Sequence, residues 1–135
     1  MREILFRGKR IDNGEWVEGD FLAPVFEGIP WILPRGEGEE VKVDPSTVGQ
    51  YTGLCDKNGK KAFSHDITKD FWGRVWVIFD CPGGFGICTR DEWTENNGEV
   101  YTALSDHQNS EWFKENHAII GHIHDNPELL EVSHE

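Results

Sequence analysis

The chain has few cysteines and no long apolar run, and both absences limit what it can be. Its 135 residues include three cysteines, and Cys55, Cys81 and Cys88 lack the paired spacing of a zinc site. We therefore expect reduced thiols. No apolar run approaches the roughly 20 residues that span a bilayer. The N-terminus also lacks the basic-then-apolar pattern of a secretory signal, so we expect a cytosolic protein without membrane association.

Positive charge is scarce, above all in the second half of the chain. The formal net charge is −12. Residues 1–69 carry ten Lys or Arg against twelve Asp or Glu, whereas residues 70–135 carry three against thirteen. A surface this acidic repels phosphate backbones, which disfavours duplex nucleic acid as a partner. It also fits an acidic decoy that mimics nucleic acid toward a DNA-handling protein, and we keep that function as an alternative.

One cluster of basic residues stands at the beginning of the chain, formed by Arg2, Arg7, Lys9 and Arg10. Its simplest interpretation is the solvated face of a strand. Binding of single-stranded nucleic acid through this cluster is the alternative.

Motifs for nucleophilic catalysis are missing. Ser64-His65-Asp66 contains the residue types of a catalytic triad. Neighbouring residues on a strand point to opposite faces, however, so these three cannot form one. We therefore expect no catalytic residue and no cofactor.

Two histidines leave one enzymatic alternative open. His122 and His124 are two residues apart, so on a strand both rings would point to one face, as metal ligands can. His65, His107 or His117 could complete such a site. Because no cysteine pair or His-Glu-x-x-His motif accompanies them, we expect no metal site. A metal-dependent enzyme that uses His122 and His124 is the alternative.

Glycine and proline are plentiful and spread along the chain, which is typical of many short turns between strands. The predicted strands are residues 4–10, 15–21, 31–33, 41–43, 48–54, 60–63, 74–79, 85–89, 100–104 and 117–123. Residues 74–79 are apolar on both faces and should be central, whereas 31–33 stand between two prolines and should be short or at an edge. Ser110 is placed to cap a short helix up to Glu115. Asn126-Pro127 fits the cap and first position of a single helical turn.

Several segments resemble the YopX-like family, small proteins of phages and prophages whose function is not established. The resemblance is carried by Arg2-Glu3-Ile4-Leu5-Phe6-Arg7-Gly8, Trp16-Val17-Glu18-Gly19-Asp20, Val43 to Ile67, and Ile120 to Leu130. It implies a mostly β fold with a small barrel of the Src-homology-3-like type, and no catalytic residues. The family usually has Glu-Gly-Asp where this chain has Ser64-His65-Asp66. The loss of this glycine bears on the local turn, because Gly accepts a positive φ more easily than His.

These observations predict a single all-β domain with little helix. It comprises an N-terminal β-hairpin lobe over residues 1–45, a small Src-homology-3-like barrel over 46–130 and a tail over 131–135. The eight Phe, six Trp and two Tyr should mostly be core,. Trp72, which precedes Gly73 at the start of a strand, is the aromatic we expect on a binding surface.

The predicted function is that of a non-catalytic phage or prophage accessory protein in the bacterial host cytosol. It would act through contacts with a protein partner or with a second copy of itself. The acidic decoy and the metal-dependent enzyme remain the alternatives.

Overall fold

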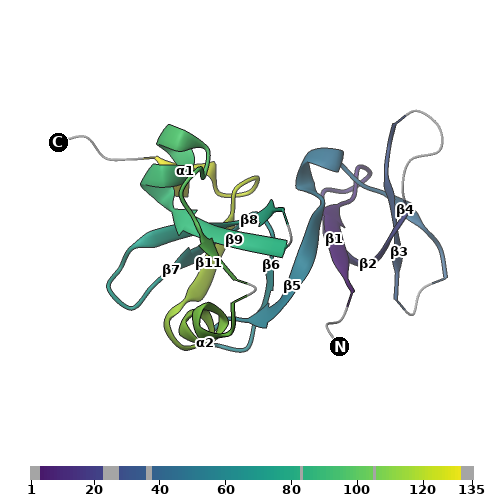
Figure 1. Cartoon of the computed structure of the whole chain (residues 1–135). Coiled ribbons are helices and arrows are strands. Elements are labelled where there is room, and N and C mark those ends of the chain that lie inside the picture. Colours follow the sequence, from purple (N-terminus) through teal and green to yellow (C-terminus); the bar gives the residue numbers. More distant parts are fainter. Residues whose placement is uncertain (1–3, 23–27, 36–37, 83, 105, 132–135) are drawn as a thin grey trace. The chain divides into compact units, whose positions relative to one another are not determined.

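The computed structural model describes residues 4–22, 28–35, 38–82, 84–104 and 106–131. The chain divides into two compact units, Met1–Gly53 and Leu54–Glu135, named unit 1 and unit 2 (Figure 1). Residues 132–135 of the predicted tail lie outside the described residues.

Unit 1 is an antiparallel sheet of short strands. Its elements are β1 (Phe6–Lys9), β2 (Trp16–Leu22), β3 (Trp31–Pro34), β4 (Val41–Lys42), the 3-10 turn η1 (Pro45–Thr47) and β5 (Gly49–Cys55), whose last residues enter unit 2. The hydrogen-bonded order is β4-β3-β2-β1-β5-β6, where β6 (Lys61–Phe63) already belongs to unit 2. Gly14, at a φ of 73°, makes the predicted turn between β1 and β2,. The strands predicted for this part of the chain are confirmed.

β3 has four residues, so the prediction of a short or an edge strand is met by its length. It lies between β2 and β4 and not at an edge of the sheet. Its neighbour β4 reaches only Trp31 and Ile32, which pair with Lys42 and Val41. Pro34 lies beyond the residues that pair with β4. Its lack of a backbone N–H therefore costs no hydrogen bond between the two strands.

The core of unit 1 depends on a close approach of β2 and β3. Ile32 and Val43 are fully buried there. A Cβ added to Gly19 would lie 2.0 Å from the backbone oxygen of Leu33. The two strands can therefore pack at this distance only because residue 19 has no side chain.

Unit 2 holds a five-stranded antiparallel sheet between two helices. Its further elements are β7 (Asp66–Lys69), β8 (Val75–Cys81), β9 (Gly84–Thr89), α1 (Arg90–Asn96), β10 (Thr102–Ala103), α2 (His107–Asn116), β11 (Ala118–His122) and the 3-10 turn η2 (Pro127–Leu130). The order is β10-β9-β8-β7-β11. The central position predicted for residues 74–79 is confirmed, because β8 is the middle strand.

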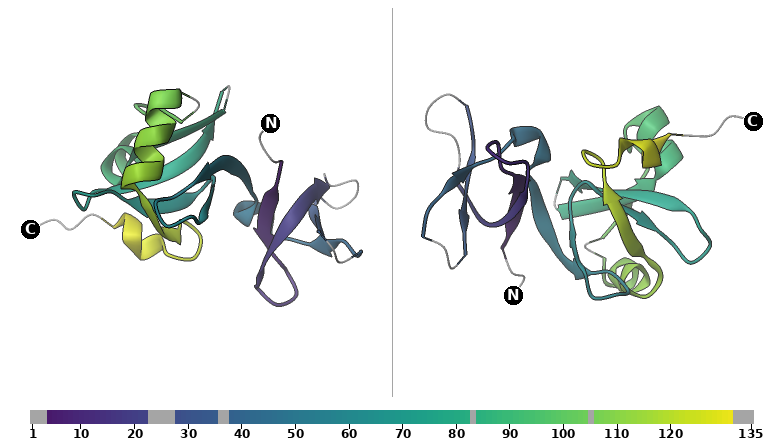
Figure 2. Two further views of the ribbon diagram at one scale, coloured as in Figure 1. Left: turned by 90° about the horizontal axis from the view of Figure 1, so that it is seen from below. Right: turned by 180° about the vertical axis from the view of Figure 1, so that it is seen from behind.

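The two helices cover opposite faces of this sheet. Phe113 of α2 belongs to the buried cluster that contains Ile78. Trp93 of α1 packs on Phe79, with ring centroids 5.4 Å apart. Neighbouring residues of a strand point to opposite faces, so Ile78 and Phe79 place one helix on each side (Figure 2).

The fold is mainly β with little helix, as predicted. The Src-homology-3-like barrel is not confirmed, because the described residues form two open antiparallel sheets and no closed barrel. Neither helix in the described ranges is long and apolar enough to cross a membrane.

The helical segments differ from the prediction at their starts. Residues 90–96 were assigned to no helix, yet α1 begins after Thr89, whose hydroxyl oxygen accepts a hydrogen bond from the N–H of Glu92. Asp106 and not Ser110 caps α2. The turn η2 is confirmed, but the side chain of Asn126 does not cap it.

Candidate functional site

The connection between β7 and β8 is a rigid five-residue turn, Asp70–Arg74, which we name the aromatic turn. Oδ1 of Asp70 accepts hydrogen bonds from the backbone N–H of Trp72 at 2.9 Å and of Arg74 at 2.8 Å. Its Oδ2 accepts one from Nε1 of Trp76 at 2.9 Å. Gly73 supplies the left-handed residue, at a φ of 86°,. One buried carboxylate thus holds the whole turn.

The environment of Asp70 keeps it ionised. Burial by itself opposes the charged form, but the hydrogen bonds from Trp76, Arg74 and Trp72 outweigh it and hold the pKa of Asp70 below its ordinary value,. The turn therefore keeps its geometry at neutral pH.

Two aromatic side chains project from this turn. Phe71 is 75% exposed and Trp72 is 73% exposed. Their rings meet edge to face, with centroids 5.6 Å apart. Exposed tryptophan on a rigid element is typical of the residues that carry binding energy at protein interfaces.

A second turn of unit 2 has the same construction with a polar tip. In this polar turn, Asp56–Lys60, Oδ1 of Asp56 accepts from the backbone N–H of Asn58 and of Lys60, each at 2.9 Å. Gly59 takes the left-handed position at a φ of 85°. Lys57 and Asn58 therefore occupy the positions that Phe71 and Trp72 have in the aromatic turn. The turn geometry does not require aromatic residues.

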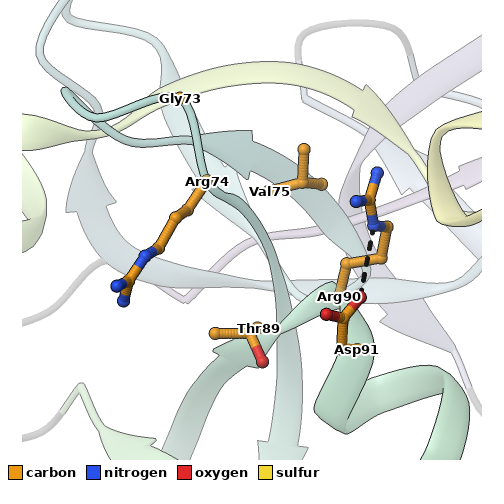
Figure 3. Close-up of a pocket in the computed structure, with 6 residues that line it drawn as sticks. All are labelled: Gly73, Arg74, Val75, Thr89, Arg90 and Asp91. Carbon is orange, nitrogen blue, oxygen red and sulfur yellow. Dashed lines mark ion pairs between the residues drawn. The ribbon is translucent and has the colours of Figure 1, made fainter. Parts of the chain in front are cut away.

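An open pocket of about 400 Å³ lies beside the aromatic turn. Its lining residues are Gly73, Arg74, Val75, Thr89, Arg90 and Asp91. The antiparallel pairing of Trp76 with Thr89 brings the start of β8 next to the end of β9. Figure 3 shows the side chains of Arg74 and Arg90 on either side of Thr89, with Asp91 against Arg90.

The sequence analysis singled out one residue of this candidate site. Trp72 is exposed next to the pocket, where a binding aromatic was predicted, and its role stays a prediction. Phe71, Arg74 and Arg90 were missed. The spacing of Asp70 and Gly73, which repeats that of Asp56 and Gly59, could have revealed the rigid turn.

The candidate metal ligands lie in a different part of unit 2. His122 is buried, and its Nδ1 accepts a hydrogen bond from the backbone N–H of His124 at 2.9 Å. His124 lies beyond the end of β11, so the two-residue repeat of a strand does not extend to it. The ring centroid of His65 is 6.3 Å from that of His122. Among the described residues, no three His, Cys, Asp or Glu side chains are grouped so that they could hold a metal ion.

His65 stands where the resemblance described above leads us to expect glycine, and its φ is 74°. This left-handed conformation is uncommon for residues other than glycine. The turn is nonetheless kept by backbone hydrogen bonds from His65 to Ile78 and from Ile123 to His65. The chain therefore carries local backbone strain at His65,.

His117 is enclosed and cannot act as a surface base. It is fully buried, with Nδ1 at 2.8 Å from Oγ1 of Thr68. Its Nε2 has no hydrogen-bond partner in the described part of the chain. Burial lowers the pKa of His117 to about 4, although the charge of Asp70 acts in the opposite direction.

Cys88 is not an activated nucleophile. Cys55, Cys81 and Cys88, all within the described ranges, form no disulfide. Burial, with the nearby charge of Glu92, raises the pKa of Cys88 to about 11. A thiol with this pKa is protonated at neutral pH.

Comparison with known proteins gives the family. A family model described as YopX protein matches residues 5–131. The chain belongs to the YopX family. This YopX chain is also similar to the crystal structure of protein EF1440 from Enterococcus faecalis, at 22% sequence identity and a TM-score of 0.52. The similarity covers 97% of the YopX chain and 100% of the other, and at this identity it shows a shared fold alone,. No curated protein sequence matches.

Proposed function

We propose that this YopX-family protein is a non-catalytic binding module that recognises a protein partner through the aromatic turn. It would serve as a phage or prophage accessory protein in the cytosol of a bacterial host. Partner recognition uses Phe71 and Trp72 as anchors, with the turn already in its binding conformation. A rigid anchor loses little conformational entropy on binding.

The comparison of the two turns is the observation that carries this proposal. In the polar turn, Lys57 and Asn58 stand at the equivalent positions, so the turn geometry does not itself call for aromatic side chains. Two aromatic rings that are both about three-quarters exposed therefore contribute little to the core of unit 2,. A partner protein that covers both rings in a complex would explain why they are exposed to solvent in the free chain.

The environments of His117, His122 and Cys88 support a role without chemistry. His117 is enclosed by aromatic rings, His122 is buried, and Cys88 has a raised pKa. A general base or nucleophile needs reach to a substrate and a pKa matched to its task.

Replacing Phe71 and Trp72 with the residue types at the equivalent positions of the polar turn tests the proposal. The double variant Phe71→Lys/Trp72→Asn converts the aromatic turn into the sequence pattern of the polar turn. It should keep the stability of the protein within about 0.5 kcal/mol. The matched control is Val100→Asn, because Val100 is a hydrophobic residue of unit 2 that is also 73% exposed.

The measurement is affinity capture from the bacterial host, identification of the captured protein and reconstitution with that protein in purified form. We expect the wild type and the Val100→Asn control to bind equally, and the turn variant to lose about 100-fold in affinity. Equal binding by the turn variant would show that the proposal is wrong. Light scattering during size exclusion tells whether the partner is a second copy of the chain.

The charge of residues 70–135 supports a second candidate, an acidic decoy of nucleic acid. Three Lys or Arg stand against thirteen Asp or Glu in this segment. A decoy would bind a basic DNA-handling protein with an affinity that falls steeply with ionic strength. Binding that survives both high salt and loss of the acidic residues would rule this candidate out.

A further inference from the structure

We infer that the pocket beside the aromatic turn binds a carboxylate side chain of the protein partner. This inference rests on the proposed function, since it specifies the chemistry of the segment that the aromatic turn recognises. The segment would carry an apolar residue for Phe71 and Trp72 and an acidic residue for Arg74 and Arg90.

Among the residues that the structure describes, the guanidinium of Arg74 and Nε of Arg90 have no hydrogen-bond acceptor. Arg74 is exposed, and its guanidinium donates no hydrogen bond to any residue that the structure describes. Nε of Arg90 is covered, and it too has no hydrogen-bond partner there. Asp91 lies nearby, at 3.7 Å from Nε to Oδ1, which is too long for a hydrogen bond (Figure 3),.

An arriving carboxylate would satisfy these donors. Each guanidinium carries several N–H groups in a planar fork that matches the two oxygens of a carboxylate. The hydroxyl of Thr89 accepts from the N–H of Glu92 and keeps its own O–H available for donation into the pocket,. Val75 supplies an apolar wall, so the ion pair would be partly shielded from water,.

The distribution of charge points to the same ligand. Residues 70–135 contain three basic side chains, Arg74, Arg90 and Lys114. Lys114 is paired with Glu111 at 3.0 Å within α2. The other two line one pocket, and with Asp91 they leave it positive in an otherwise acidic segment.

A single carboxylate fits this pocket better than a nucleic-acid strand. The positive charge is confined to two side chains, whereas the chain as a whole carries −12. A strand would bring successive phosphates close to the surrounding acidic surface, and a peptide with one acidic residue would not.

The test uses two capped tripeptides, acetyl-Leu-Glu-Leu-amide and acetyl-Leu-Gln-Leu-amide, with the full-length protein at constant ionic strength. The arginine Nε–H signals of Arg74 and Arg90 are followed by ¹H–¹⁵N NMR during the titration. Arg10, whose guanidinium is bonded to Asp12 in unit 1, is the internal reference. Inorganic phosphate and a short oligothymidylate are titrated in parallel.

We expect the Glu peptide to shift both signals in a saturable manner, with an affinity about fivefold or more above that of the Gln peptide. The double variant Arg74→Gln/Arg90→Gln should lose this preference. Lys114→Gln, a single-charge control, should change the affinity by less than about twofold, because it removes one charge from the same segment at an exposed pair.

Equal affinities for the two peptides, or shifts no larger than those of Arg10, would overturn the inference. Tighter binding of oligothymidylate or phosphate at the same signals would also overturn it, in favour of a phosphate ligand. Failure of this inference can be distinguished from failure of the proposed function. If the turn variant abolishes partner binding while the arginine variant binds normally, the aromatic turn is the site and the carboxylate pocket is wrong.

Discussion

His117 is a buried base in a box of aromatic rings. The rings of Trp76, Trp112 and Phe113 lie with centroids 5.6, 4.5 and 5.1 Å from that of the imidazole. A protonated imidazole would lose its hydration there, which is why the pKa of His117 falls to about 4,. The residue should therefore be neutral in the folded protein and titratable only after unfolding or at acid pH.

This neutral histidine predicts a stability that depends on pH. The unfolded chain takes up a proton at His117 near its ordinary pKa of 6.5, whereas the folded protein does so near 4. Stability is thus fully present above pH 6.5 and is lost as the pH falls toward 4. The loss should reach at most about 3 kcal/mol, because one pKa unit corresponds to 1.36 kcal/mol.

Denaturant unfolding at a series of pH values measures this loss. The double variant Thr68→Val/His117→Phe removes both members of the pair and should flatten the profile between pH 4 and 6.5. His107→Gln, which changes an exposed histidine, is the control variant. An NMR titration that places the pKa of His117 at 6 or above would contradict the prediction, even if the double variant fails to fold.

His65 predicts a stabilising substitution. At a φ of 74° a side chain with a Cβ is strained,, so His65→Gly should raise the free energy of unfolding by about 1 kcal/mol. Asn97→Gly is the matched control, because Asn97 has a φ of 54° but the short polar side chain of Asn can hydrogen-bond locally in this region. Thermal unfolding of both variants measures the difference. A lower melting temperature for His65→Gly would show that the side chain contributes contacts worth more than the strain.

At the scale of the turns, Asp70 and Asp56 stabilise their turns in the same way, but the side chains that follow them differ. Oδ2 of Asp70 accepts from Trp76, and Oδ2 of Asp56 accepts from the N–H of Ile119 at 2.8 Å. Each carboxylate thus joins its own turn to a neighbouring element. Removal of either should cost a similar free energy, but only one of them positions the aromatic tip.

The variants Asp70→Ala and Asp56→Ala should each lower the free energy of unfolding by about 2 kcal/mol, since each loses three hydrogen bonds,. Only Asp70→Ala should also speed hydrogen exchange at the amides of Trp72 and Arg74 and weaken partner binding. Mass-spectrometric exchange and the capture assay measure the two effects. Equal loss of partner binding in both variants would mean that the aromatic turn has no special role.

Most turns and strands could be predicted because their signals are local, although β7 was not among the predicted strands. Asn58-Gly59 marks its hairpin by itself, and the apolar run of β8 shows that it is central. The capping pattern of Thr89 and Glu92 was also present, but the regular alternation of strands and turns outweighed it and α1 was missed. A helix, strand or turn can be predicted from sequence where one short local pattern is sufficient to specify it.

The pocket could not be predicted in this way. Arg74 and Arg90 are brought together by the register of β8 and β9, in which Trp76 pairs with Thr89. Register follows from packing of the whole sheet and not from either strand alone. For the same reason the sequence did not show that β3 is internal, because that depends on how far β4 extends.

At the scale of the molecule, each unit has buried residues of its own. Leu5, Ile32 and Val43 are buried in unit 1, and Ile78 and Phe113 are in the main cluster of unit 2. A core of this kind allows a segment to unfold as a cooperative unit. Unit 1 has 53 residues, a size at which stability is marginal,. We therefore expect unit 1 to open before unit 2.

Gly19→Ala tests this independence. The added Cβ would meet backbone atoms of Leu33 and Pro34 at 2.0 to 3.0 Å, which a side-chain rotation cannot relieve. We expect a loss of more than about 3 kcal/mol in unit 1. Hydrogen exchange should then increase in β1 to β4 while β8 and β9 stay protected.

Phe113→Ala should show the reverse order of protection, because it empties the core of unit 2 at a cost of about 3–5 kcal/mol. Simultaneous loss of protection in both units with either variant would mean that the chain unfolds as one cooperative body, so that binding through unit 2 would depend on the integrity of unit 1.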